Sequence, residues 1–252
     1  MFRLRFPLGI AGIVGIILLT SAYVVAFGSG KNMFFSTLPW VAFLIVIMIL
    51  WFAIASFSFQ KGTAVVILPT LVLFCLLFLS SFIAWPFGGI RATDMLGYAF
   101  FQRIPWTIPI FWQLIFMSSL YLYRPNVKHL LPRDLLQWAF DASLYTSVIL
   151  FLLVAPLFSA GVFLPTDPSN VSIATIQCII GSFLCTIVAC TVHLSLSLSL
   201  PSPIVQRTIL FISCLLLLFS TALGFRVGSP IVGLLCIIMI AVTMHRMKRI
   251  RS

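Results

Sequence analysis

The feature that most constrains this chain is a succession of long apolar segments, separated by short stretches that contain Pro, Gly or charged residues. A helix needs about 20 apolar residues to cross the hydrocarbon core of a bilayer. Reading the breaks between segments as span ends delimits eight crossings. They cover residues 8–27, 38–59, 63–85, 104–123, 138–163, 171–200, 204–223 and 228–244. We therefore expect an all-α, polytopic integral membrane bundle of about eight transmembrane helices, in which residues 1–252 form a single transmembrane domain.

Composition agrees with this fold class. Hydrophobic residues make up 62% of the chain, charged residues 8%, and the mean hydropathy is +1.22. Because about a quarter of the residues in soluble domains are charged, a water-soluble fold is excluded. The sixth segment, which ends in LSLSLSLP, and the last two, which are separated by a short turn, have the least distinct bounds. Seven crossings is therefore the alternative count.

The distribution of positive charge predicts an orientation. In the eight-span arrangement, the side that holds both termini carries eleven of the 15 Lys and Arg residues, namely Arg3, Arg5, Lys61, Arg124, Lys128, Arg133, Arg207, Arg246, Lys248, Arg249 and Arg251. The other side carries Lys31, Arg91, Arg103 and Arg226. Because cytoplasmic loops retain the excess of Lys and Arg, we expect a multi-pass protein of the cell inner membrane with both termini in the cytoplasm. The net charge of +11 then faces lipid head groups, and we expect no nucleic-acid partner.

Scarce acids exclude several chemistries. The chain has no Glu, and its four acids are Asp94, Asp134, Asp141 and Asp167. Glu-dependent zinc proteases and enzymes with Asp-rich magnesium motifs are therefore excluded. The six Cys residues lie inside apolar segments without a CxxC pair, and the three His residues are dispersed. We expect neither a metal site nor a cofactor.

The stretch from Trp85 to Gln113, between the third and fourth segments, is dense in Gly, Pro and aromatic residues. Its pattern consists of Phe87-Gly88, Thr93-Asp94, Leu96-Gly97, Phe101, Ile104-Pro105, Ile108-Pro109 and Trp112. In this order and spacing it resembles the membrane-embedded carotenoid biosynthesis proteins, a family that includes carotenoid hydratases. The resemblance implies a hydrophobic polyene substrate and a lyase-class reaction without cofactor, in which water adds to the acyclic end of the polyene after acid-catalysed protonation.

Hydration of a terminal alkene requires a proton donor, and Asp94 and Asp141 are the candidate catalytic residues. Burial disfavours the carboxylate anion, so a carboxyl group in apolar surroundings can stay protonated and donate. Asp141 belongs to a series with Asp134, Trp138 and Tyr145, whose spacing places all four on one helix face. Asp94 is supported by the resemblance. The topology places the two acids on opposite sides of the membrane. The alternative for each is an ion pair: Asp141 with Arg133 or Lys128, and Asp94 with Arg91.

The reaction also needs stabilisation of a carbocation, which aromatic ring faces can supply. The candidate substrate-binding residues are Arg91, Trp106, Trp112, Gln113, Trp138 and Tyr145. For the aromatic residues the alternative is anchoring at the membrane interface. Gln113 must find a hydrogen-bond partner within an apolar segment, either on a neighbouring helix or on a substrate.

A second class of function remains open, a noncatalytic membrane protein that is either a small-solute carrier or an assembly partner. Residues 63–85 contain no acid, and Ala155 precedes Pro156 where the carotenoid family carries one. Few ionisable groups are thus available inside the membrane for catalysis.

Overall fold

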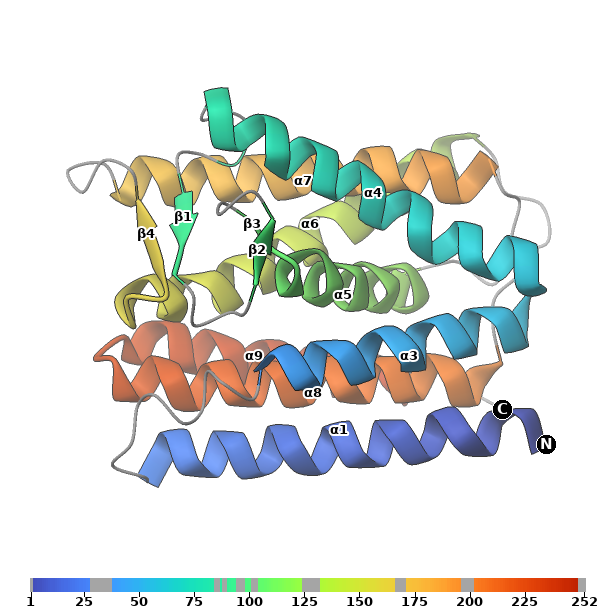
Figure 1. The fold of residues 1–252 in the computed structure, drawn as a ribbon, viewed down its shortest axis with the longest axis horizontal. Coiled ribbons are helices and arrows are strands. Elements are labelled where there is room, and N and C mark those ends of the chain that lie inside the picture. The colour runs from blue at the N-terminus through green and yellow to red at the C-terminus, as the bar shows by residue number, and fades with distance from the viewer. Residues whose placement is uncertain are drawn as a thin grey trace.

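Helices form nearly all of the described chain in the computed structural model (Figure 1). The structure describes residues 2–27, 38–83, 87, 90–93, 98–100, 104–123, 132–165, 171–195 and 202–248. Within these ranges the helices are α1 (Phe2–Phe27), α3 (Leu38–Ser56), α4 (Phe59–Ile83), α5 (Thr107–Tyr123), α6 (Pro132–Ser159), α7 (Val171–Ser195), α8 (Pro203–Arg226) and α9 (Pro230–Met247). Each corresponds to one of the eight predicted apolar segments.

Seven of the helices in the described ranges are long and apolar enough to cross a membrane. The shorter one is α5, an apolar helix of 17 residues. The predicted fold class, an all-α membrane bundle, is confirmed. The counts of seven and eight spans differ by α5, which corresponds to the fourth predicted segment, 104–123, and is shorter than the other helices in the described ranges.

The last two segments form separate helices joined by a tight turn. Pro203 and Pro230 open α8 and α9, at positions where a backbone N–H would have no partner within the helix. Between the helices, Gly228 has a φ of 78°, a left-handed conformation that side chains disfavour. The glycine therefore allows α9 to fold back directly on α8.

The helices run side by side in alternating directions (Figure 1). The start of α1 and the end of α9 lie at the same end of the bundle, which we name the terminal end. The turn between α8 and α9 lies at the opposite end, which we name the strand end because two short strands, Ile90–Ala92 and Phe163–Pro165, lie there. Lys61, Arg133 and Arg207 lie near the first residues of α4, α6 and α8, all at the terminal end.

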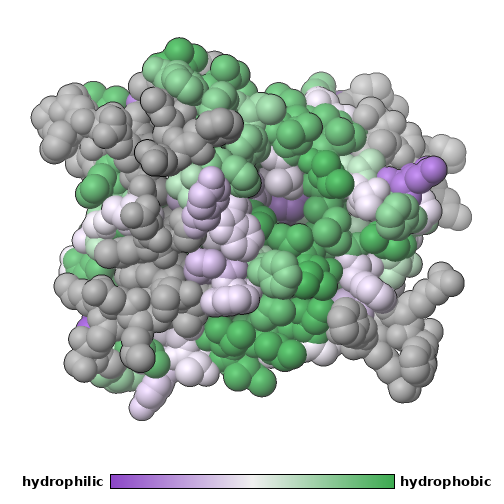
Figure 2. Space-filling view, viewed as in Figure 1, coloured by the Kyte–Doolittle hydropathy of each residue, from purple (hydrophilic) through white to green (hydrophobic). Residues whose placement is uncertain are grey.

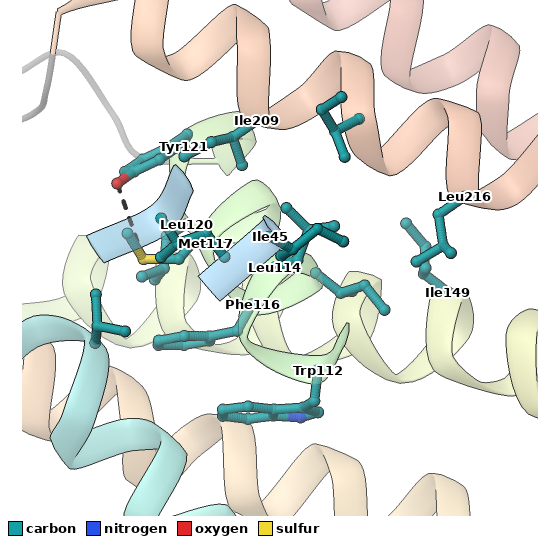
Figure 3. Close-up of a cluster of buried hydrophobic side chains, with 14 of the residues drawn as sticks. Ile45, Trp112, Leu114, Phe116, Met117, Leu120, Tyr121, Ile149, Ile209 and Leu216 are labelled. Carbon is teal, nitrogen blue, oxygen red and sulfur yellow. Dashed lines mark hydrogen bonds between the residues drawn. The ribbon is translucent and has the colours of Figure 1, made fainter. Parts of the chain in front are cut away.

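The short helix α5 is the centre of the bundle and contacts α3, α4, α6, α8 and α9. Residues 112–121 are buried without interruption, so this part of the helix is enclosed by its neighbours. Figure 3 shows its core side chains: the ring of Trp112 stacks on that of Phe116 with centroids 5.1 Å apart, and the hydroxyl of Tyr121 donates to Sδ of Met117 at 3.8 Å. α5 is thus a core helix more than a lipid-facing one.

Two pairs of short strands lie in the half of the bundle that contains the strand end. β1 (Ile90–Ala92) pairs antiparallel with β4 (Phe163–Pro165), and β2 (Ala99–Phe100) pairs antiparallel with β3 (Ile104–Pro105). Backbone N–H and C=O groups in or near a bilayer must be paired within the protein, and these ladders pair some of them where the chain is not helical. Strands of two or three residues have no detectable periodicity, so the sequence pattern does not indicate them.

The connection between α4 and α5 reaches into the bundle. The ring of Phe100 in β2 meets that of Phe74 edge-on, with centroids 5.3 Å apart. Phe74 lies about 14 Å along α4 from its last residue, at 1.5 Å per residue. The hairpin of β2 and β3 thus occupies part of the depth that a longer α5 would span.

Candidate functional site

A groove of about 590 Å³ lies between α3, α4 and the first half of α5. We name it the α3–α4–α5 groove. Its volume falls within the range of pockets that hold small ligands, about 300–1,000 Å³. The side chains of Val46, Ile49 and Leu50 form one wall from α3, and residues between Val66 and Phe74 form the facing wall from α4.

The third side of the groove comes from one face of α5 and the residue before it. Trp106, Pro109, Ile110 and Gln113 follow the spacing i, i+3, i+4 and i+7, which places side chains on the same face of a helix. Two of the predicted substrate-binding residues, Trp106 and Gln113, are therefore brought together in this wall. Phe100 of β2, whose ring contacts that of Phe74, also lines the groove.

The groove opens sideways from the bundle. Among its lining residues, Ile67 is 55% exposed, Leu71 51% and Phe100 41%. Ile67 and Leu71 lie near the middle of α4, at a depth that corresponds to the hydrocarbon core of a bilayer. Figure 2 shows a hollow on this face, bordered by hydrophobic surface and with hydrophilic surface at its floor. The groove is therefore open toward the side of the bundle that carries these exposed apolar residues.

Gln113 is the most polar side chain of the groove lining and is only 2% exposed. Its amide nitrogen Nε2 donates to the carbonyl oxygen of Val65 at 3.4 Å. Its amide oxygen Oε1 is buried and accepts no hydrogen bond from the described residues. The hydroxyl of Thr70, the other small polar group of the lining, donates to the carbonyl of Val66 at 2.7 Å. The described lining of the groove thus contains one buried side-chain acceptor without a donor, Oε1 of Gln113.

Three of the predicted substrate-binding residues lie away from the groove lining. Trp112 faces the core, where it stacks on Phe116. Trp138 is buried against α7, with its ring centroid 6.3 Å from that of His193. Tyr145 is buried with its hydroxyl 2.5 Å from that of Thr243 in α9. Their predicted role in substrate binding stays a prediction.

Of the two predicted catalytic acids, the structure describes only Asp141. Asp141 is half-buried on α6, near enough to Tyr123 for its charge to act on the phenol. Asp94 and the side chain of Arg91 lie outside the described residues. Thr93, which precedes Asp94, donates its N–H and its hydroxyl to the carbonyl of Val162, beyond the end of α6. Asp141 lies about 27 Å along α6 from that end.

A second polar cluster lies at the terminal end. The ring centroids of Tyr123 and Tyr145 are 5.5 Å apart, and the guanidinium carbon of Arg246 lies 4.3 Å above the ring of Tyr123. Stacking of a cation on an aromatic face is favourable by about 0.5–1 kcal/mol at exposed sites. The cluster ties the end of α9 to α5 and α6 and is consistent with an anchor at the membrane interface.

Phe87 and Thr93, two described residues of the pattern between Trp85 and Gln113, hold the connection between α4 and α5 in place. Phe87 is buried, its N–H is donated to Oγ of Ser80 at 3.0 Å, and its ring packs against Gly181 of α7. Thr93 attaches the same connection to Val162. Part of this pattern therefore has a structural role.

No protein family, curated protein or solved structure matches this chain. The described residues include no group of three or more His, Cys, Asp or Glu side chains that would hold a metal ion. The fold defines the class, a polytopic helical membrane protein, and the α3–α4–α5 groove is the feature on which a specific function can be argued.

Proposed function

We propose that this protein binds an acyclic isoprenoid or polyene in the α3–α4–α5 groove and acts in carotenoid biosynthesis, as the resemblance of residues 85–113 implies. The observation that carries the proposal is the groove itself: about 590 Å³, lined almost entirely by apolar side chains and open at the depth of the lipid hydrocarbon. Apolar surface that leaves contact with water or lipid for a complementary wall gains packing contacts along its whole length.

The shape of the groove fits an elongated guest. Its wall on α4 extends from Val66 to Phe74, about 12 Å along the helix axis. Phe74, Phe100 and Trp106 gather at the end nearer the strands. Aromatic faces there would pack on the double bonds of a polyene and would stabilise positive charge on it.

The proposal is tested by narrowing the groove. Leu71→Trp adds a large ring to the groove wall, whereas Leu79→Trp adds the same ring to a residue of α4 that is equally exposed, at 53%, and lies outside the lining. Purified protein in detergent is incubated with an acyclic polyene such as lycopene, and co-elution on size-exclusion chromatography is followed by absorbance. We expect Leu71→Trp to lower retention several-fold and Leu79→Trp to leave it unchanged.

Ile110→Trp provides an independent test, because Ile110 lies in the wall that α5 contributes to the same groove. Retention that is equal in the wild type and in both groove variants would contradict the proposal.

The finer form of the proposal is hydration of the bound polyene. A carboxylic acid gives its proton to one alkene carbon, water adds its oxygen to the resulting cation, and the proton lost by that water restores the acid. Incubation with lycopene should yield a hydroxylated end group, and Asp94→Asn or Asp141→Asn should reduce its yield. Unchanged yield in both variants would reject these acids as proton donors.

The noncatalytic alternative is favoured by one observation: no carboxyl side chain occurs among the described residues that line the groove. The same incubation separates the two functions. A polyene that is retained by the groove and recovered unchanged indicates a carrier or an assembly partner, whereas a hydroxylated product indicates a hydratase.

We also propose the inner membrane as the location, with both termini in the cytoplasm. The support is the placement of Lys61, Arg133 and Arg207 at the terminal end of the bundle. A reporter enzyme that is active only in the cytoplasm should be active when it is fused to the C-terminus. A Ser229→Cys variant, in the turn between α8 and α9, should react with an impermeant thiol reagent added outside.

A further inference from the structure

We infer that the ligand of the α3–α4–α5 groove is an isoprenoid alcohol whose hydroxyl donates a hydrogen bond to Oε1 of Gln113. The inference rests on the proposed function, since it takes the groove as the binding site, and it specifies the chemical class of the ligand.

The orientation of the Gln113 amide follows from its neighbour. The carbonyl oxygen of Val65 can only accept a hydrogen bond, so the nitrogen Nε2 must face it. The oxygen Oε1 is then left as an acceptor, buried and without a donor among the described residues. Buried polar atoms are almost always paired, so a specific exception points to a missing donor.

Because the described residues around Gln113 supply no donor, we take a guest in the groove as its source. Hydrocarbon, which faces the open side of the groove, has no group that donates a hydrogen bond. The hydroxyl proton of Thr70 is already given to Val66, within α4 itself.

The arrangement also sets the direction of the ligand. Trp106 lies about 10 Å from Gln113 along the direction of α5, and Phe100, in contact with Phe74, lines the same groove. The hydroxyl end therefore lies at Gln113, and the apolar chain extends toward Phe74 and Phe100. A hydroxyl that enters an apolar site must replace the hydrogen bonds it loses, and Oε1 supplies one of them.

The test compares three compounds that share one chain: geranylgeraniol, its methyl ether, which lacks the donor, and the corresponding hydrocarbon. Equilibrium binding of each radiolabelled compound is measured on the full-length protein in nanodiscs. Because one net hydrogen bond changes affinity by about 2- to 10-fold, we expect the wild type to prefer the alcohol over the ether by this factor.

Gln113→Met replaces the amide by an apolar side chain of similar length and should abolish the preference while the ether still binds. Gln206→Met makes the same change at a buried glutamine of α8, outside the groove lining, and should retain the preference. Thermal unfolding of both variants checks that they are folded, and the comparison of compounds on the wild type needs no variant.

Two results would overturn the inference while leaving the groove as a binding site. Equal affinity of the wild type for all three compounds would mean that the groove takes any apolar chain, such as a lipid acyl chain. A preference for the alcohol that survives Gln113→Met would place the acceptor elsewhere. A different result, no saturable binding of any of the three compounds, would overturn the proposed function and this inference with it.

Discussion

The ring of Phe87 occupies the space that a side chain on Gly181 would need. A Cβ atom on Gly181 would lie 2.8 Å from Cδ1 of Phe87, closer than carbon atoms pack. Gly181 is in the middle of α7, and Phe87 belongs to the connection between α4 and α5. This contact therefore holds the connection that leads into the groove wall.

The Gly181→Ala variant should unfold at a lower temperature than the wild type. Overpacking of a filled interior costs about 1–3 kcal/mol, more than the roughly 1 kcal/mol by which Ala is favoured over Gly in a helix. The measurement is thermal unfolding in detergent. Gly12→Ala in α1 is the control, because no atom lies within 4 Å of its Cβ position, and it should be neutral or stabilising. Equal stability of the two variants would contradict the predicted close contact.

The Gly62→Ala variant should be more severely affected. A Cβ atom on Gly62 would lie 2.6 Å from the backbone carbon of Ala53, and backbone atoms cannot move aside as a ring can. Helices α3 and α4 form two walls of the groove, and the turn between them would have to open. We expect a loss of several-fold in the yield of monodisperse protein, measured by size-exclusion chromatography. A yield like that of Gly12→Ala would show that the two helices do not approach this closely.

The hydroxyls of Tyr145 and Thr243 should be energetically coupled. Thr243 donates to the carbonyl of Met239 at 2.7 Å, so its oxygen is the acceptor for the phenol 2.5 Å away. Hydrogen bonds between helices in membranes contribute about 0.6 kcal/mol on average. A double-mutant cycle with Tyr145→Phe and Thr243→Val, read by thermal unfolding, should return a coupling of about that size. Tyr98→Phe, at an exposed phenol, serves as the control, and additive effects of Tyr145→Phe and Thr243→Val would argue against the bond.

Removal of the Arg226 guanidinium should loosen α1 from α8. Nη1 of Arg226 donates to the carbonyl of Val25 at 2.6 Å, in the last turn of α1, where backbone carbonyls lack partners within the helix. Hydrogen bonds from charged groups contribute about 1.5–3 kcal/mol, and partial exposure of Arg226 reduces this. Arg226→Gln should therefore unfold at a lower temperature, and Lys61→Gln, at an exposed base, should not. Protease cleavage between α1 and α3 gives a second readout, which should rise only in Arg226→Gln.

The positions of the helices were predictable from the chain because of the solvent in which they form. In a bilayer each apolar segment must pair its backbone internally, so a run of sufficient length becomes a helix. The predicted segments 204–223 and 228–244 correspond closely to α8 (Pro203–Arg226) and α9 (Pro230–Met247). The fifth segment shows the limit of this reasoning: predicted as 138–163, it begins earlier, at Pro132, and ends at Ser159, before a turn in which Gly161 has a φ of 75°.

The neighbouring helix that each side chain contacts was much less predictable. Gly9, Gly12 and Gly15 recur along α1 at a spacing typical of close contact between membrane helices. Of these three glycines, only Gly15 has an atom within 4 Å of its Cβ position, Cδ1 of Leu215. Likewise, Trp138 and Tyr145 share a helix face by spacing but contact different helices, α7 and α9. Spacing along one helix does not say which neighbour lies opposite each turn.

The amino-acid order was thus sufficient for the class of protein, the helices and the asymmetry of positive charge, since these follow from local hydropathy and from the charge of each loop. The groove depended on how the helices assemble. Leu71 and Leu79 are the same residue on the same helix with similar exposure, and only Leu71 lines the groove. Lipid is as apolar as leucine, so hydrophobicity does not distinguish a lipid-facing side chain from a groove-facing one, and packing between helices makes that distinction.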